Sequence, residues 1–248
     1  MSNTMTIASL KPYFKFPFQG KWQDRFLVGA GLTFLSTMIP VIPSIFVFGY
    51  ALRVMRQVIE GEEPSLPDWN DWGKLGMDGL RATLVSLVYL LPGTVIFMGG
   101  MAFYFVSILA MSAMEEAANP GPFIAFFIAG IATFFLSLAI GSLLMLLGAI
   151  LMPLGLARLL VHDRLAAAFH LREIGSVLRA NMLGYFIVWT LVLGLMSCLS
   201  FVIMLLYYSV CLCCLIQFAA APVGFYLSLV SVALFGKVYR ESTGEQVA

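Results

Sequence analysis

Charge is what this sequence has least of. Only 11% of its 248 residues are Asp, Glu, Lys or Arg, and the formal net charge is +1, whereas soluble domains contain about 25% charged residues. A chain this poor in basic residues lacks the positive field that attracts nucleic acid, so we expect no nucleic-acid partner. Hydrophobic residues make up 61% instead, which excludes an ordinary soluble domain.

Cysteine frameworks and leader features are also missing. The cysteines, at 198, 211, 213 and 214, all lie in one apolar run, unlike the spaced cysteines of small exported domains. Positions 211 and 214 share a helix face but 213 points away, and no histidine is near, so we expect no metal site. The first 25 residues lack the apolar core and cleavage site of a signal peptide. We therefore expect the first membrane segment to direct insertion.

Long uncharged runs determine the fold class. Crossing a hydrocarbon core of about 30 Å takes roughly 20 apolar helical residues, and the alternation typical of a barrel is missing. We therefore predict an all-α, polytopic helical membrane protein with four to six membrane segments, multi-pass in the cell (inner) membrane. The runs without Asp, Glu, Lys or Arg are residues 26–52, 82–114, 117–157 and 181–236.

Three parts are expected along the chain. Residues 1–25, with several aromatic and basic side chains, should form a membrane-surface arm. Residues 26–240 should form a single transmembrane domain, and residues 241–248 a C-terminal tail. Within the domain we predict a weak repeat relating residues 26–114 to residues 117–208, followed by a last span over residues 210–236.

The charges in the loops predict the topology. The loops at 53–81 and 158–179 and the C-terminus are basic, whereas the loops near 115–121 and 207 contain no Lys or Arg. The excess of Lys and Arg in cytoplasmic loops places the first group inside. Crossings that satisfy this rule are 82–114, 117–157, 181–206 and 210–236.

Prolines and glycines predict interruptions within these segments. Pro40 and Pro43 lie in the middle of residues 26–52, so a straight helix is not expected there. This segment either crosses once or, as we prefer, folds back at Ile39–Pro43 as a re-entrant hairpin; the side of the N-terminus is left open. Residues 117–157 are too many for one untilted span, so we expect a tilted helix or a break near Gly141, Gly148 or Pro153.

Two aromatic segments follow the basic ends of apolar runs. Asp68 is placed to cap a helix that carries Trp69 and Trp72 at helical spacing, and tryptophans favour the membrane interface. Phe169 occupies a comparable position after Gly155–Arg158. The order of basic exit, interfacial amphipathic helix and re-entering helix therefore occurs twice, which is the weak internal repeat.

Several motifs carry a family resemblance. They are Gly49-Tyr50-Ala51-Leu52-Arg53, Leu66-Pro67-Asp68-Trp69-Asn70-Asp71-Trp72-Gly73, Asp78-Gly79-Leu80, Ala168-Phe169-His170-Leu171-Arg172, Ala221-Pro222-Val223-Gly224-Phe225-Tyr226 and Gly236-Lys237-Val238-Tyr239-Arg240.

Over nearly its whole length the chain resembles the prokaryotic integral membrane protein family catalogued as domain of unknown function 4013. The block beginning at Pro67 is the most specific part. Family members usually have Phe-Asp-Phe in the second motif, where this chain has His170, so no acidic role carries over. The resemblance implies a multi-spanning membrane protein and supplies no activity.

No ionisable side chain lies inside a predicted span, where such groups are costly and mark ion pathways or catalysis. We therefore predict no catalytic residue, no cofactor and no enzymatic activity. Basic side chains beside interfacial aromatics are suited to lipid headgroups. The candidate lipid or interface residues are Arg53, Arg56, Trp69, Trp72, Lys74, Arg81, Phe169 and Arg172.

Two functions are weighed. The first is a non-enzymatic scaffold or accessory subunit that packs in the bilayer against another integral membrane protein, because Gly29-Ala30-Gly31 and Gly99-Gly100 allow close helix approach. The alternative is a transporter or channel for a neutral or lipidic solute, suggested by the repeat and the interrupted helices. A continuous polar cavity would favour transport, and a dry core with an apolar flank would favour the scaffold.

Overall fold

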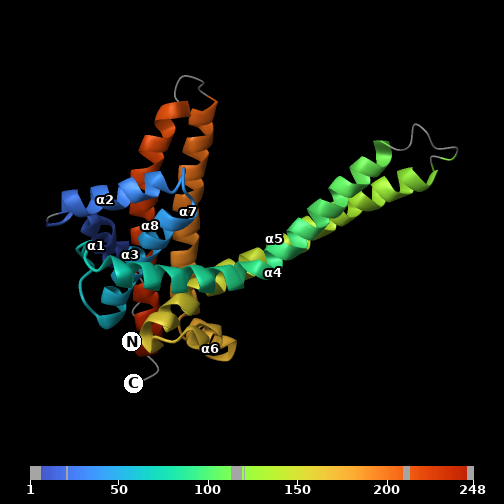
Figure 1. Ribbon diagram of the computed structural model, residues 1–248. Coiled ribbons are helices and arrows are strands. Elements are labelled where there is room, and N and C mark those ends of the chain that lie inside the picture. Colours follow the sequence, from blue (N-terminus) through green and yellow to red (C-terminus); the bar gives the residue numbers. More distant parts are fainter. Residues whose placement is uncertain (1–6, 21, 113–118, 120, 209–212, 245–248) are drawn as a thin grey trace. The chain divides into compact units, whose positions relative to one another are not determined.

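The chain is helical and contains no strand over the residues that the structure, a computed structural model, describes (Figure 1). These residues are 7–20, 22–112, 119, 121–208 and 213–244. The predicted all-α class is therefore confirmed.

Five helices are long and apolar enough to cross a membrane, within the four to six that the sequence predicts. Because such runs are buried only by lipid or by other helices, the chain is a multi-pass membrane protein. The candidate spans are α3 (Val41–Glu60), α4 (Trp72–Ser112), α5 (Gly121–His162), α7 (Met182–Tyr207) and residues Phe218–Gly244 of α8 (Cys213–Gly244).

The chain divides into two compact units. The first contains residues 1–85 and 153–248, and the second contains residues 86–152. Helices α4 and α5 each contribute to both units. The shorter elements of the first unit are α1 (Ile7–Lys15), η1 (Phe16–Phe18), α2 (Trp22–Leu35), η3 (Leu165–Phe169) and α6 (Leu171–Ala180).

Helix α8 forms the centre of the first unit. It contacts α2, α3 and α7, and it also touches α1 and α6; Figure 1 shows it in red beside α7. The fully buried ring of Phe225 on α8 lies 5.4 Å from the ring of Phe26 on α2 and 5.9 Å from that of Tyr50 on α3. Aromatic packing of this kind therefore joins α2 and α3 to α8.

The N-terminal arm packs inward onto α8. Leu10, Tyr13 and Phe16 are buried, and the Tyr226 hydroxyl on α8 donates a hydrogen bond to the Phe14 carbonyl at 3.0 Å. Pro12 lies within α1, so it does not end that helix. That the arm also meets the membrane surface stays a prediction.

Residues 26–52 are interrupted where the prolines predict it. Helix α2 ends at Leu35 and α3 begins at Val41, after Pro40, and the two helices contact each other as well as α8. Only α3 has the length and composition of a span. The re-entrant entry of this pair into the membrane stays a prediction.

Two predicted boundaries are wrong: the start of the helix after Asp68, and the separation of that helix from the crossing that begins at residue 82. Trp69 lies in non-helical chain rather than in a helix capped by Asp68, because α4 begins at Trp72. The left-handed backbone of Asp71 (φ 60°) precedes the helix, and its carbonyl accepts the first bond, from the Leu75 N–H at 3.1 Å. The predicted interfacial helix and the following crossing are therefore one continuous helix that starts three residues later than expected.

Long helices also continue through their prolines. Helix α4 passes Pro92 and α5 passes Pro153 without a break, because losing one backbone donor is tolerated where hydrocarbon offers no alternative partner to the rest of the backbone. Most of the loop near 115–121 lies outside the described residues. Cys211 also lies outside them.

The second unit is a pair of antiparallel helices, residues 86–112 of α4 and 121–152 of α5, called the hairpin below. Its described residues carry no charged side chain. Every residue that is classed as buried in it is a glycine or a serine, and the large apolar side chains lie on the outside. The buried set is Gly93, Gly100, Ser107, Gly130, Ser137, Gly141 and Gly148.

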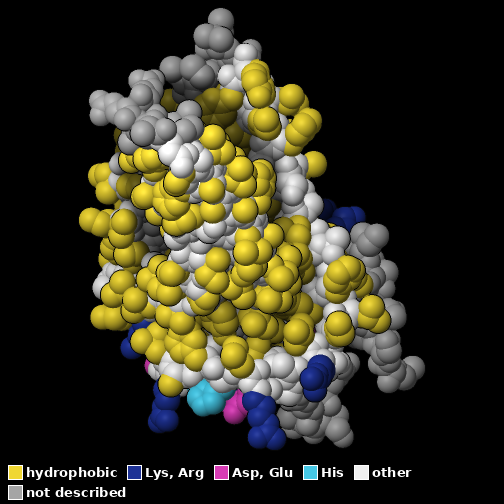
Figure 2. All heavy atoms as spheres, turned by 90° about the vertical axis from the view of Figure 1, so that its right-hand side faces the viewer, with side chains coloured by type: hydrophobic (Ala, Val, Ile, Leu, Met, Phe, Trp, Pro, Cys, Tyr) yellow, Lys and Arg dark blue, Asp and Glu magenta, His cyan; other side chains and the backbone are white. Residues whose placement is uncertain are grey.

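These seven residues, called the glycine-serine seam, bring two backbones together. A Cβ atom added to Gly148 would lie 2.2 Å from the Tyr89 carbonyl oxygen, and one added to Gly93 would lie 2.6 Å from the Gly141 oxygen. Small residues of this kind are what membrane helices use to pack closely. Figure 2 shows the hydrophobic side chains that cover the hairpin's surface.

Candidate interface site

Residues 66–71, called the strap below, carry the most specific motif of the sequence and are fastened to α3. The Tyr50 hydroxyl donates to the Pro67 carbonyl at 2.8 Å. Arg53 donates from Nη1 to the Asn70 carbonyl at 2.9 Å and from Nη2 to the Asp71 carbonyl at 3.2 Å. Two side chains from one turn of α3 therefore donate hydrogen bonds to three backbone carbonyls of the strap, which has no helix or strand of its own.

The strap is also fastened to the start of α2. Arg25 forms an ion pair with Asp68 (Nη2 to Oδ1, 2.6 Å) and donates to the Leu66 carbonyl at 2.5 Å. In return, the indole Nε1 of Trp69 donates to the Arg25 carbonyl at 2.7 Å. These reciprocal bonds keep Trp69 out of the helix that its spacing predicts.

Aromatic rings of α3, the strap and the start of α4 pack against one another. The Trp69 ring stacks on Tyr50 with centroids 4.0 Å apart, and Trp72 lies 5.6 Å from Trp69. Phe46 on α3 meets Trp72 edge-on at 5.5 Å. Trp72 is 45% exposed, so an amphipathic ring lies at the surface of this aromatic cluster. Tryptophans at a membrane interface are exposed in the same way.

The second half of the predicted repeat has a buried arginine with comparable contacts. Arg158, near the end of α5, is only 6% exposed. Its Nε donates to the Ala167 carbonyl at 3.1 Å, and its Nη2 forms an ion pair with Glu173 on α6. Arg53 and Arg158, called the exit arginines below, therefore have comparable roles, since each lies within a long helix and donates to a carbonyl of the segment that follows that helix.

Replacing Arg158 with glutamine is expected to destabilise the first unit by about 1–3 kcal/mol, because the Ala167 carbonyl and Glu173 lose a charged donor. Arg172→Gln is the matched control, since Arg172 on α6 is exposed and exposed charges contribute little. Thermal unfolding of the purified chain in detergent measures both. Equal midpoints for the two variants would contradict the role of Arg158.

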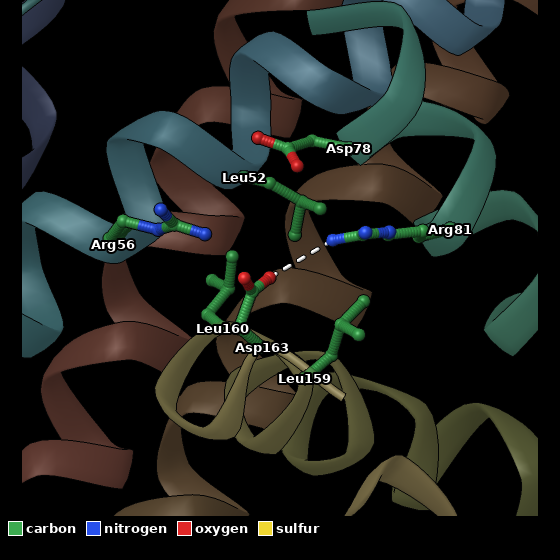
Figure 3. A pocket seen from close by; sticks show the side chains of 7 residues that line it. All are labelled: Leu52, Arg56, Asp78, Arg81, Leu159, Leu160 and Asp163. Carbon is green, nitrogen blue, oxygen red and sulfur yellow. Dashed lines mark hydrogen bonds and ion pairs between the residues drawn. The ribbon is translucent and has the colours of Figure 1, made fainter. Parts of the chain in front are cut away.

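A small polar cluster lies where α3, α4 and the end of α5 meet (Figure 3). Arg81 on α4 pairs with Asp163 (Nη1 to Oδ1, 3.0 Å), and Arg56 and Asp78 line the same space. Asp163 follows α5 in a left-handed conformation (φ 49°). The space between them has a volume of about 10 Å³, which is about that of one water molecule. Two cations and two carboxylates therefore form a balanced joint with no room for an organic substrate.

The predicted lipid residues are not gathered in one site. Arg56 and Arg81 line the polar cluster, Trp69 and Trp72 stack, and Arg53 holds the strap. The remaining three face outward: Lys74 near the start of α4, Phe169 at the end of η3 and Arg172 on α6. Contact of any of them with lipid stays a prediction.

Sequence reasoning missed several residues that build this site. Arg158 was interpreted only as a topology signal, although its place after Gly155-Leu-Ala repeats that of Arg53 after Gly49-Tyr-Ala-Leu and offered the signal. Arg25 is the last charged residue before the first uncharged run, which gives no hint of its partners in the strap. Among the described residues, no group of three His, Cys, Asp or Glu side chains converges as metal ligands do.

The chain matches one family model over residues 32–208, that of a protein of unknown function, DUF4013. No curated protein and no solved structure matches it. The matched range contains the strap, both exit arginines, the polar cluster and the hairpin, and it ends before α8.

Proposed function

Because the chain belongs to the DUF4013 family of proteins of unknown function, we propose from its own architecture that it is a non-enzymatic scaffold or accessory subunit of a membrane protein complex. Its proposed partner is another integral membrane protein in the cell (inner) membrane. The observation that carries this proposal is the hairpin, in which every buried described residue is glycine or serine and the large apolar side chains lie outside.

The glycine-serine seam favours packing over solute passage within the hairpin. Where a methyl group on Gly148 would sit 2.2 Å from a backbone oxygen, no solute can pass between the two helices. The outer surface carries phenylalanine, leucine and isoleucine side chains that are more than half exposed, including Phe105, Leu109, Ile128, Phe135 and Leu136. Such a surface is complementary to lipid chains and to an apolar partner helix.

The alternative function, a transporter or channel for a neutral or lipidic solute, is supported by one observation. The two exit arginines, Arg53 and Arg158, make comparable contacts in the two halves, and duplicated halves are common in transporters. Uptake of neutral solutes by liposomes that contain the purified chain tests it.

Gentle detergent extraction from native membranes tests the scaffold. We expect a second membrane protein to co-purify at a constant ratio. The variant Phe135→Ala/Leu136→Ala, on the hairpin's outer face, should lower that ratio at least about tenfold, because an apolar contact is lost. Leu183→Ala/Phe186→Ala on α7 is the control, since these side chains are at least as exposed as Phe135 and Leu136.

The control variant should keep the partner. A chain that purifies alone, or loses its partner equally in both variants, would contradict the proposal.

A further inference from the structure

A cleft of about 510 Å³ lies in the first unit, between α1, the chain that follows α3 and the C-terminal part of α8. This volume falls within the range of about 300–1,000 Å³ that ligand sites occupy. None of its polar lining belongs to the strap, the polar cluster or the predicted lipid residues. The polar lining consists of Tyr13, Gln19, Glu62, Glu63, Lys237 and Arg240.

The inner wall of the cleft is built from cations and a phenol. Lys237 is only 7% exposed; its Nζ lies 5.2 Å from the Tyr13 ring centroid and 3.9 Å from the Glu241 carboxylate. Arg240 donates from Nη1 to the Val58 carbonyl at 3.2 Å. Burial raises the pKa of the Tyr13 hydroxyl, against the lowering effect of nearby Arg240. Tyr13 therefore stays a neutral donor, and the wall offers donors to an anion.

Two acids complete the polar lining of the cleft. Gly236 lies against Met55, and Arg240 lies against Val58 and Gly61, so α3 and α8 run in the same direction here. Glu62 and Glu63 follow Gly61 directly and are exposed. The cleft therefore has two exposed carboxylates in the segment after α3 and two cations on α8, of which Lys237 is buried.

We propose that this cleft binds a phosphoethanolamine headgroup, with the phosphate against Lys237 and Arg240 and the ammonium group against Glu62 and Glu63. Phosphate oxygens accept from lysine and arginine, and an ammonium group has three donors for carboxylates. Both charged groups of this headgroup therefore find a partner of opposite charge in the lining of the cleft. The proposal takes phosphatidylethanolamine as the source and does not rest on the scaffold function.

Discrimination between headgroups follows from the outer acids. A glycerol headgroup would leave Glu62 and Glu63 without a cationic partner, and the quaternary choline group has no N–H to donate. A site selects a ligand partly by such unmatched groups in its competitors. We therefore expect phosphatidylethanolamine to bind about tenfold more tightly than phosphatidylglycerol or phosphatidylcholine.

Native mass spectrometry of the detergent-purified full chain, titrated with each of the three lipids, tests this. Glu62→Gln/Glu63→Gln should remove the preference for phosphatidylethanolamine, and Arg240→Gln should weaken binding of all three lipids about tenfold. Glu60→Gln and Arg179→Gln are the controls, since neither residue lines the cleft and Arg179 is exposed. The glutamate pair is exposed and its substitution leaves the folded core intact, so it decides the test if Arg240→Gln fails to fold.

Soluble phosphoethanolamine separates the two sources of this chemistry. If it displaces bound phosphatidylethanolamine, both ligands occupy the headgroup site, as proposed. Binding of the soluble compound without binding of the lipid would overturn the lipid assignment. Equal retention of the three lipids by the native chain, or equal effects in the cleft and control variants, would overturn the site itself.

Discussion

Gly79→Val is expected to be among the most damaging single substitutions in the first unit. A Cβ atom at Gly79 on α4 would lie 1.8 Å from the carbonyl oxygen of Ile45 on α3, and one at Gly49 would lie 2.0 Å from the Leu75 oxygen. Both obstacles are backbone, which cannot rotate aside. We expect a loss of at least about 3 kcal/mol of unfolding free energy, because α3 and α4 must separate.

Gly73→Val is the matched control for this crossing. Gly73 lies on the same helix, and a Cβ atom there would meet nothing within 4 Å. Thermal unfolding in detergent, followed by tryptophan fluorescence, reports on the contact between α3 and α4 because Trp69 and Trp72 lie beside it. Equal unfolding midpoints for the two variants would show that α3 and α4 do not cross in close contact.

Gly148→Val should have a comparable effect on the hairpin. The added Cβ would lie 2.2 Å from the Tyr89 carbonyl oxygen, so the two helices must move apart along the glycine-serine seam. Helix association in lipid relies on close packing rather than on water exclusion, so little else compensates. We expect a loss of about 2–4 kcal/mol.

Gly99→Val tests whether the seam is specific. Gly99 adjoins the buried Gly100 but has nothing within 4 Å of its would-be Cβ. This variant should change stability by less than about 0.5 kcal/mol, as measured by unfolding of the chain reconstituted in bicelles. A Gly99→Val chain as unstable as Gly148→Val would contradict the seam.

The composition of the chain was enough to predict its class and its long helices. Uncharged runs of sufficient length have few alternatives to helix in a bilayer, and Pro40 lies where α2 and α3 are separated. Among the small-residue patches, Gly29 and Gly100 lie in close contacts, whereas Gly31 and Gly99 meet nothing. Sequence marks a patch as small without telling which of its residues faces a neighbour.

The strap shows why the candidate site was harder to predict. Trp69 and Trp72 have helical spacing, but the bonds of Trp69 and Asp68 to Arg25 come from 44 and 43 positions away in the chain, and local pattern contains no trace of them. In the sequence, Arg158 looks like any basic residue at the cytoplasmic end of a membrane span, yet it is buried against Ala167 and Glu173. Tertiary partners therefore decided both cases.

The glycine-serine seam had a usable signal. Gly93, Gly100 and Ser107 recur every seven residues on α4, as do Gly130 and Ser137 on α5. A seven-residue repeat keeps one face of a helix turned toward a partner helix. The period predicts a seam, whereas the pairing of these two helices within one chain required the structure.

Photo-crosslinking in intact native membranes tests the central claim most directly. A photoreactive residue placed singly at Phe135 or Leu136, on the outer face of the hairpin, should form an adduct with one discrete membrane protein. The same residue at Leu183 on α7 should not form that adduct. Adducts with lipid alone from both hairpin positions would contradict the scaffold function.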